Sequence, residues 1–178
     1  MNVRRVVTGK TADGKSVFVS DESVLPITAA ISPGSEFHSI WGSDTVTRLP
    51  QSGTKPAFMQ WFPPAGGYRF GFFTVPPANT AAPQVADVGA AIAEFEQKLP
   101  GLMGHMEPDH PGMHTTDTVD IDLVISGEVW LELDDGAEVH LGPGDCVVQN
   151  GTRHAWRNKS DQPCVLAVAL IGAQPAPR

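Results

Sequence analysis

The sequence predicts an all-β fold of short antiparallel strands with one flanking helix. Two observations support this. Apolar runs with period-two alternation recur between residues 112 and 172, separated by Gly, Asp and Pro. The 16 prolines and 18 glycines suit many turns better than a helical bundle. A chain of 178 residues is long enough for one substantial core, so residues 1–178 are expected to form a single domain.

The strands are expected in two groups. Residues 121–125 and 129–133 form alternating runs on either side of Gly127, and the apolar run 162–172 supplies a closing strand. Residues 1–100 add N-terminal strands at 3–7, 16–20, 37–41 and 70–75.

A single helix is predicted at 83–99. Its apolar residues recur at spacings of three and four, and Pro100-Gly101 ends it. The stripe most simply packs on the outside of a sheet, although a partner-binding helix is an alternative. The stripe consists of Val85, Val88, Ile92, Phe95 and Leu99.

Composition excludes several classes of protein. The net charge of −8 argues against a nucleic-acid partner. No apolar run reaches the ~20 residues that a membrane-spanning helix needs. Residues 1–5 lead into no signal-type apolar segment, so a cytoplasmic location is expected. Cys146 and Cys164 lie in apolar runs and are predicted to be buried thiols rather than a disulfide.

Polar side chains are expected to converge inside the fold. Alternate residues of a strand share a face, and burying polar groups is costly unless they are paired or bind a metal. An alternative is that the histidines are hydrogen-bonded core residues. The residues on one face are His114, Thr116, Thr118, Asp120 and Asp122, with His154, Trp156 and Asn158 on another strand.

Residues 112–172 resemble the cupin superfamily, specifically its small single-domain members of the conserved-barrel type. The family's first motif has two histidines one residue apart, then a glutamate and a glycine; its second ends in a histidine and an asparagine. The matching residues here are His114 and Gly127 for the first motif, and Gly144-Asp145, Gly151, His154 and Asn158 for the second. The resemblance implies a jelly-roll β-barrel.

This sequence departs from the family pattern at three positions. Thr116 replaces the second histidine, Asp120 replaces the glutamate, and Gln149 replaces a proline. The metal site that the resemblance implies is therefore reduced to His114, Asp120 and His154. Two histidines and one carboxylate can hold a divalent metal such as Fe, Zn, Mn or Ni.

These residues predict a small-molecule enzyme, with His114, Asp120 and His154 as catalytic groups and Thr116, Asp122 and Trp156 in the substrate pocket. The expected substrate is small, largely apolar and oxygenated, such as a phenolic, keto acid or polyketide-like compound. Dioxygenase and lyase, isomerase or decarboxylase chemistry remain open. Alternatives are a metal-free cupin that uses His and Asp as acid and base, and a non-catalytic binding protein.

Several further residues carry expectations. Arg153 and Arg157 should face away from His154, which disfavours a phosphate ligand. His105 and His110 should be exposed, with His110 a spare ligand as the alternative, and His140 should be exposed. The orientation of Trp130 stays open, and His38 has no informative context. Apolar alternation on both strand faces, together with the family's habit of pairing barrels, predicts a homodimer.

Overall fold

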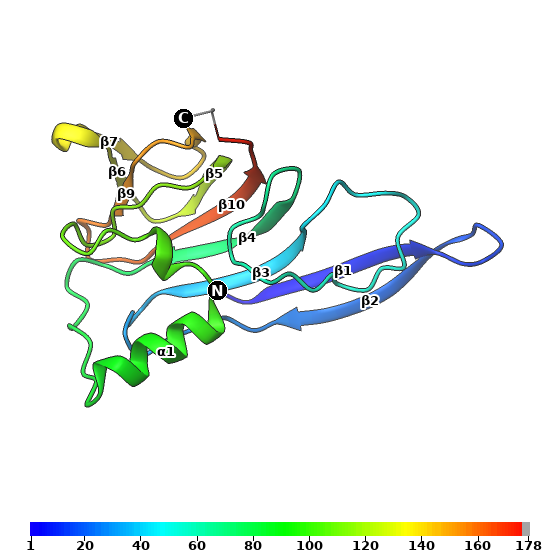
Figure 1. Cartoon of the computed structure of the whole chain (residues 1–178), viewed down its shortest axis with the longest axis horizontal. Coiled ribbons are helices and arrows are strands. Elements are labelled where there is room, and N and C mark those ends of the chain that lie inside the picture. Colours follow the sequence, from blue (N-terminus) through cyan, green and yellow to red (C-terminus); the bar gives the residue numbers. More distant parts are fainter. Residues whose placement is uncertain (176–178) are drawn as a thin grey trace.

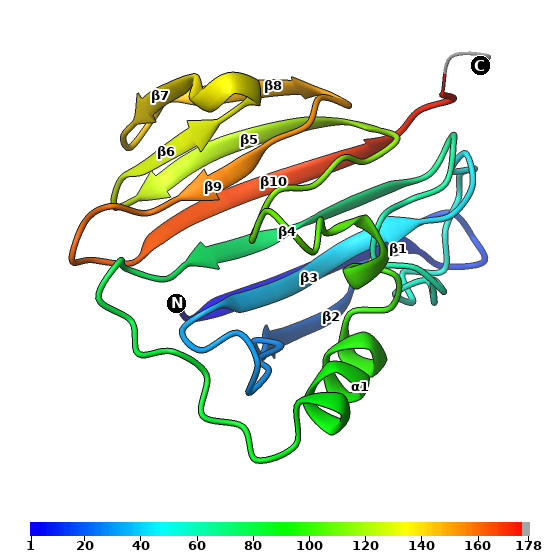
Figure 2. The same cartoon turned by 60° about the vertical axis from the view of Figure 1, so that its left-hand side comes forward.

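Two antiparallel sheets face each other in the computed structural model, which describes residues 1–175. This arrangement confirms the all-β, jelly-roll prediction (Figures 1 and 2). The larger sheet has the order β3 (Glu36–Ser43), β4 (Tyr68–Val75), β10 (Cys164–Gly172), β5 (Thr118–Ser126), β8 (Cys146–Asn150). The smaller has the order β7 (Glu138–Leu141), β6 (Val129–Glu132), β9 (Ala155–Arg157), with the short helix η2 (Asp134–Gly136) between β6 and β7.

The N-terminal strands form a separate hairpin. β1 (Val3–Lys10) pairs with β2 (Ser16–Val24), and both strands are longer than the sequence predicted. The hairpin extends away from the two sheets as an arm (Figure 1). Its Phe18 side chain is 80% exposed.

The single helix, α1 (Val88–Lys98), begins later than expected. Asp87 caps it by accepting a hydrogen bond from the Ala90 amide, which fixes the start five residues after Pro83. Only part of the predicted apolar stripe is buried: Phe95 and Leu99 pack with Leu102, whereas Val88 and Ile92 are exposed. The helix lies beyond β3, beside the short helix η1 (Met103–His105), and does not cover the sheet (Figure 2).

The main core fills the space between the sheets. Val124 and Leu166 of the larger sheet pack against Val129 and Leu131 of the smaller. Cys164 belongs to this core as predicted. Cys146 corrects the expectation of two buried thiols, because β8 is an edge strand and its alternation turns that residue outward. Among residues 1–175, no helix is long and apolar enough to cross a membrane.

Candidate functional site

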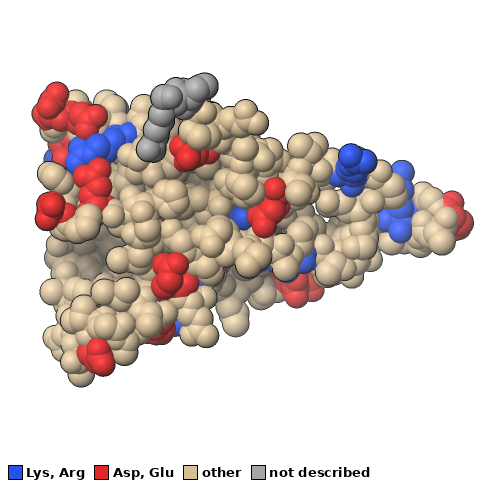
Figure 3. Space-filling view, in the orientation of Figure 1, with Lys and Arg blue, Asp and Glu red and all other residues tan. Residues whose placement is uncertain are grey.

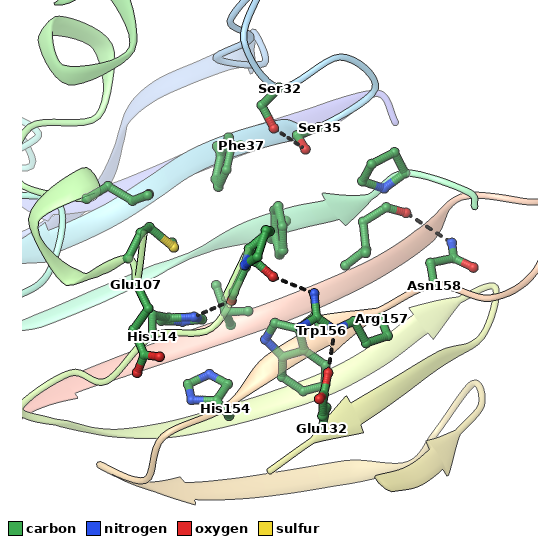
Figure 4. Close-up of a pocket in the computed structure, with 18 of the residues that line it drawn as sticks. Ser32, Ser35, Phe37, Glu107, His114, Glu132, His154, Trp156, Arg157 and Asn158 are labelled. Atoms are coloured by element: carbon green, nitrogen blue, oxygen red, sulfur yellow. Dashed lines mark hydrogen bonds and ion pairs between the residues drawn. The ribbon is translucent and has the colours of Figure 1, made fainter. Parts of the chain in front are cut away.

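A cavity of about 1040 Å³ opens between the two sheets. The space-filling view shows the molecule hollowed at the end opposite the β1–β2 arm (Figure 3). His114, His154 and Trp156 lie on one side of the cavity, and Ser32, Ser35 and Phe37 lie on the other (Figure 4). The volume lies at the upper end of the range typical of small-molecule sites.

The two motif histidines form the centre of this site. His114 and His154 exchange two backbone hydrogen bonds of 2.9 Å in an isolated bridge, which brings their ring centroids to 4.2 Å. Nδ1 of His114 lies 3.0 Å from the Gly112 carbonyl, and Nδ1 of His154 lies 2.9 Å from the Thr152 carbonyl. A carbonyl oxygen can only accept, so each Nδ1 carries the proton. Each Nε2 is thereby left with a lone pair for a ligand.

Burial keeps both imidazoles neutral. Desolvation lowers the pKa of His154 to about 4, with the neighbouring His114 adding to the effect and the Thr152 carbonyl opposing it. Desolvation also lowers the pKa of His114, against the hydrogen bond to Gly112. Near pH 7 both rings are therefore bases or ligands rather than cations.

Two buried carboxyl groups line the same cavity. Asp120 and Asp122 are each 4% exposed and lie two residues apart on β5, so they share a face. Desolvation, together with the smaller effect of the neighbouring Asp120 charge, raises the pKa of Asp122 to about 8. Desolvation raises the pKa of Asp120 to about 6, against a hydrogen bond from Thr118. The pair therefore holds at least one proton near neutral pH.

Of the other predicted pocket residues, one lines the cavity and one does not. Trp156 lines the cavity, and its ring meets the His154 ring edge-on at 6.1 Å between centroids. Thr116 is buried, but it does not belong to the cavity lining within the described chain; its hydroxyl lies 2.7 Å from that of Thr118. Thr116 therefore supports Thr118, which in turn hydrogen-bonds Asp120.

The chemical types of the donor atoms suit a divalent metal, but the distances between them do not. The Nε2 atoms of His114 and His154 face no protein partner in residues 1–175, and Oδ1 of Asp120 is buried without a hydrogen bond. Imidazole and carboxylate are ligands that Zn and Fe accept. However, nowhere in residues 1–175 do three His, Cys, Asp or Glu side chains gather closely enough to hold an ion. The structure brings the two histidines together and leaves Asp120 in the same cavity at a greater separation.

The remaining histidines lie around the site or away from it. His110 is exposed as expected and pairs with Glu107. His105 is only half-buried, because its ring packs on Phe62 and its Nδ1 contacts the Thr115 carbonyl. His38 is fully buried, and neither ring nitrogen has a hydrogen-bond partner among residues 1–175.

Trp130 faces outward. Its ring stacks on exposed His140, whose Nε2 is 2.7 Å from Glu128, and Lys159 lies over the same ring. These contacts place Trp130 on the opposite face of β6 from Leu131, which packs in the core. The alternation along β6 therefore settles the orientation that the sequence left open.

Arg157 corrects one expectation. β9 is an edge strand, so its outward residue reaches the cavity rim, where Arg157 donates to Glu132 and to the Pro111 carbonyl. Its charge is balanced by Glu132, so a phosphate ligand still lacks a free cation there. Arg153 pairs with Glu107 and Asp134.

Much of the apolar wall was missed by the sequence analysis. Apart from Phe37, it comes from segments for which the sequence predicts no strand or helix, although the adjacent aromatic residues Trp61-Phe62 in a proline-rich stretch are a usable signal. The missed lining residues include Ile31, Phe37, Trp61, Phe62, Met103 and Met106.

Comparison with known proteins identifies the domain around these histidines. Residues 103–170 match the family described as "Cupin domain". Oryzines biosynthesis cluster protein J of Aspergillus oryzae is 39% identical over 72 residues, which are 40% of this chain and 36% of that protein. Cupin-domain-containing oxidoreductase srdB of Neurospora crassa is 38% identical over 64 residues, 35% of this chain and 33% of that protein. The matched region thus spans only about a third of these relatives.

Solved structures with similar folds share little sequence. The cupin domain of Schizosaccharomyces pombe Cnp3 is 8% identical, with a TM-score of 0.49 and coverage of 95% of this chain and 87% of that chain. Polyketide cyclase RemF of Streptomyces resistomycificus is 14% identical, with a TM-score of 0.46 and coverage of 86% and 77%. Both motif histidines, which are joined by the isolated bridge, lie within residues 103–170, the part of this chain that matches the cupin domain family.

Proposed function

We propose that this chain is an enzyme that converts a small, largely apolar oxygenated compound, with His114, Asp120 and His154 as its catalytic groups. The observation that carries the proposal is the convergence of buried polar groups with unused atoms on an otherwise apolar cavity. Buried polar groups without partners are costly, and they cluster where a ligand supplies the partner. The names of two relatives, an oxidoreductase and a biosynthesis-cluster protein, also favour an enzyme.

The side chains suggest a division of labour. Neutral His154 offers Nε2 as a proton acceptor, and the carboxyl pair offers a proton from Asp122 near neutral pH. Trp156 and Phe73 form flat apolar walls that would orient an aromatic or alicyclic substrate and exclude water. A carbonyl or phenol oxygen of the substrate would lie toward the histidines, where those groups can reach it.

The proposal includes a divalent metal, Fe, Zn, Mn or Ni, held by His114, His154 and Asp120, for which Asp120 must move closer to the two histidines than it lies in the structure. When bound, such an ion would supply Lewis-acid or oxygen chemistry at the substrate oxygen. The Nδ1 hydrogen bonds of both histidines fix the tautomer that ligation requires.

A second candidate is a metal-free lyase or isomerase that uses the same residues as acid and base. The raised pKa values of Asp120 and Asp122 favour it, because a shared proton between two carboxyls beside neutral imidazoles is suited to proton transfer.

Elemental analysis of protein purified without added metal or chelator separates the two candidates. Stoichiometric metal that is lost in His114→Ala and His154→Ala, but retained in the exposed control His140→Ala, supports the metal enzyme. Metal retained by His154→Ala refutes the ligand assignment.

Turnover is tested on a panel of phenols, aromatic keto acids and aromatic polyketide-type ketones, with oxygen uptake and product mass recorded. Oxygen uptake indicates dioxygenase chemistry, and product without oxygen uptake indicates lyase or isomerase chemistry. If the wild-type protein converts no compound with or without added metal, the enzyme proposal fails in favour of a binding protein.

A further inference from the structure

The wall opposite the histidines carries a second polar feature. Ser32-Pro33-Gly34-Ser35 forms a turn closed by the hydrogen bond from the Ser35 amide to the Ser32 carbonyl, with Gly34 at φ +78°. Proline at the second position and a positive-φ glycine at the third are the requirements of a type II turn. The turn therefore holds the two serine side chains in a fixed place at the cavity wall (Figure 4).

The two hydroxyls are arranged to bind an acceptor. Ser32 Oγ donates to Ser35 Oγ at 2.8 Å. Ser35 is 6% exposed, and no hydrogen bond donated by its hydroxyl is found in the described part of the chain. A buried hydroxyl that accepts one hydrogen bond keeps its own proton for another partner. That partner would be an oxygen of a molecule in the cavity.

The serine pair and the catalytic groups lie far apart. Phe37 of β3 is opposite Phe73 of β4, which is opposite Leu166 of β10, which is opposite Val124 of β5. Three inter-strand steps at about 4.8 Å each give roughly 14 Å from β3 to β5 across the cavity floor. A single-ring compound held against Asp120 of β5 would leave the serines without a partner.

The charged residues of the lining exclude an anionic group at the far end. Arg157 is paired with Glu132, and Lys159 is paired with Glu138. The surface between the two polar ends is aromatic or aliphatic, including Phe37, Phe62 and Phe73. A long neutral ligand with aromatic or fused rings matches this surface, whereas a second carboxylate or phosphate would have no free cation.

We propose that the substrate is an extended multi-ring compound with oxygen at both ends, and that Ser35 binds the oxygen remote from the reacting one. This assignment rests on the proposed function and narrows its substrate class from small oxygenated compounds in general to multi-ring ketones and phenols. Ser35 acts as a specificity-determining residue, supported by Ser32, and takes no part in proton transfer.

The test uses binding rather than turnover. Titration calorimetry would compare a linear anthraquinone that carries a hydroxyl at each end with the same compound carrying one hydroxyl, and with phenol. One added hydrogen bond is worth about 0.5–1.5 kcal/mol, so the two-ended probe should bind wild-type protein roughly threefold to tenfold tighter. Ser35→Ala should abolish this preference and leave the affinity for the one-ended probe within about twofold of wild type.

A matched control is Ser39→Ala, because the Ser39 hydroxyl bonds Lys55 and lies outside the cavity lining. It should keep the wild-type preference. The substrate assignment is overturned if phenol binds as tightly as the one-ended anthraquinone, or if Ser35→Ala keeps the preference while its unfolding midpoint matches wild type. Neither result bears on the proposed function, which fails only if the turnover experiment finds no conversion.

Discussion

The two faces of strand β5 show the reverse of the polarity that an ordinary half-buried strand has. Toward the cavity the strand presents Asp120 and Asp122, both buried, whereas toward solvent it presents Ile121 and Leu123, both exposed. Ordinary alternation places apolar residues inside and polar residues outside. The inner face therefore has the composition of a site, and the outer face has the composition of an interface.

The outer face continues across neighbouring strands without a charged side chain. Ile121 lies between Ala169 of β10 and Val148 of β8, and Leu123 lies between Ala167 and Cys146. An apolar surface of this extent usually marks an interaction site. The buried carboxyl groups of the inner face lower the stability of the fold, and a bound ligand can offset this cost. The outer face exposes apolar area that a second copy of the chain can bury. Each of the following predictions changes one face and compares it with the other.

The largest effect should come from the inner carboxyls. The folded pKa of Asp122, about 8, exceeds the ordinary aspartate value of 3.8, so the folded chain binds protons more tightly than the unfolded chain. Stability is then greatest below pH 4 and falls as pH rises toward 8. At about 1.4 kcal/mol per pKa unit the loss of folding free energy has an upper bound of about 6 kcal/mol.

Asp122→Asn should make the free energy of unfolding, measured with urea from pH 4 to pH 9, much less dependent on pH. Asp120→Asn should remove a smaller part, because the pKa of Asp120 rises only to about 6. Stability that rises with pH over this range would show that the carboxyls are stabilised as anions in the folded protein.

The second effect concerns leucines on opposite faces. Leu166 is fully buried between the sheets, so Leu166→Ala should lower the free energy of unfolding by about 2–5 kcal/mol. Leu123→Ala removes the same atoms from the exposed face and should cost below about 1 kcal/mol at concentrations where the chain is monomeric. Equal losses in chemical unfolding would contradict the assignment of inner and outer faces.

How far the sequence could predict this arrangement depends on the range of the interactions. Alternation along β5 is a local property, and it placed Asp120 and Asp122 on one face correctly. The contact between His114 and His154 joins residues forty positions apart, and only the family motifs indicated it. The end of α1 was local and correct, whereas its start depended on the Asp87 cap, and the exposure of Ile92 depended on packing that no periodicity reveals.

The third effect concerns the interface of the expected homodimer. We predict that two copies pack through the outer face around Ile121, because this apolar surface can pair with itself about a two-fold axis. Ile121→Lys places like charges near that axis and should weaken dimerisation at least 100-fold in light scattering across the micromolar range. Val139→Lys is a matched control, since Val139 is exposed on the smaller sheet. If the wild-type protein is a monomer throughout that range, the proposed interface is refuted. If the purified protein is a monomer but forms a larger complex in cell extract, the outer face binds a different protein.

The smallest effect should come from Thr118, which is 2% exposed on the inner face of β5. Its hydroxyl bonds Thr116 and also stabilises the ionised form of Asp120. Thr118→Val keeps the shape and adds apolar character, yet it should lower the free energy of unfolding by about 1 kcal/mol, because it leaves the Thr116 hydroxyl without its partner. It should also raise the pKa of Asp120 further. In the Asp120→Asn background the pH-dependent part of the change should disappear, while the loss of the Thr116 bond should persist. If unfolding at pH 5 and pH 7 changes equally in both backgrounds, Thr118 does not act on Asp120, and the inner face of β5 is a set of independent polar groups rather than a coupled site.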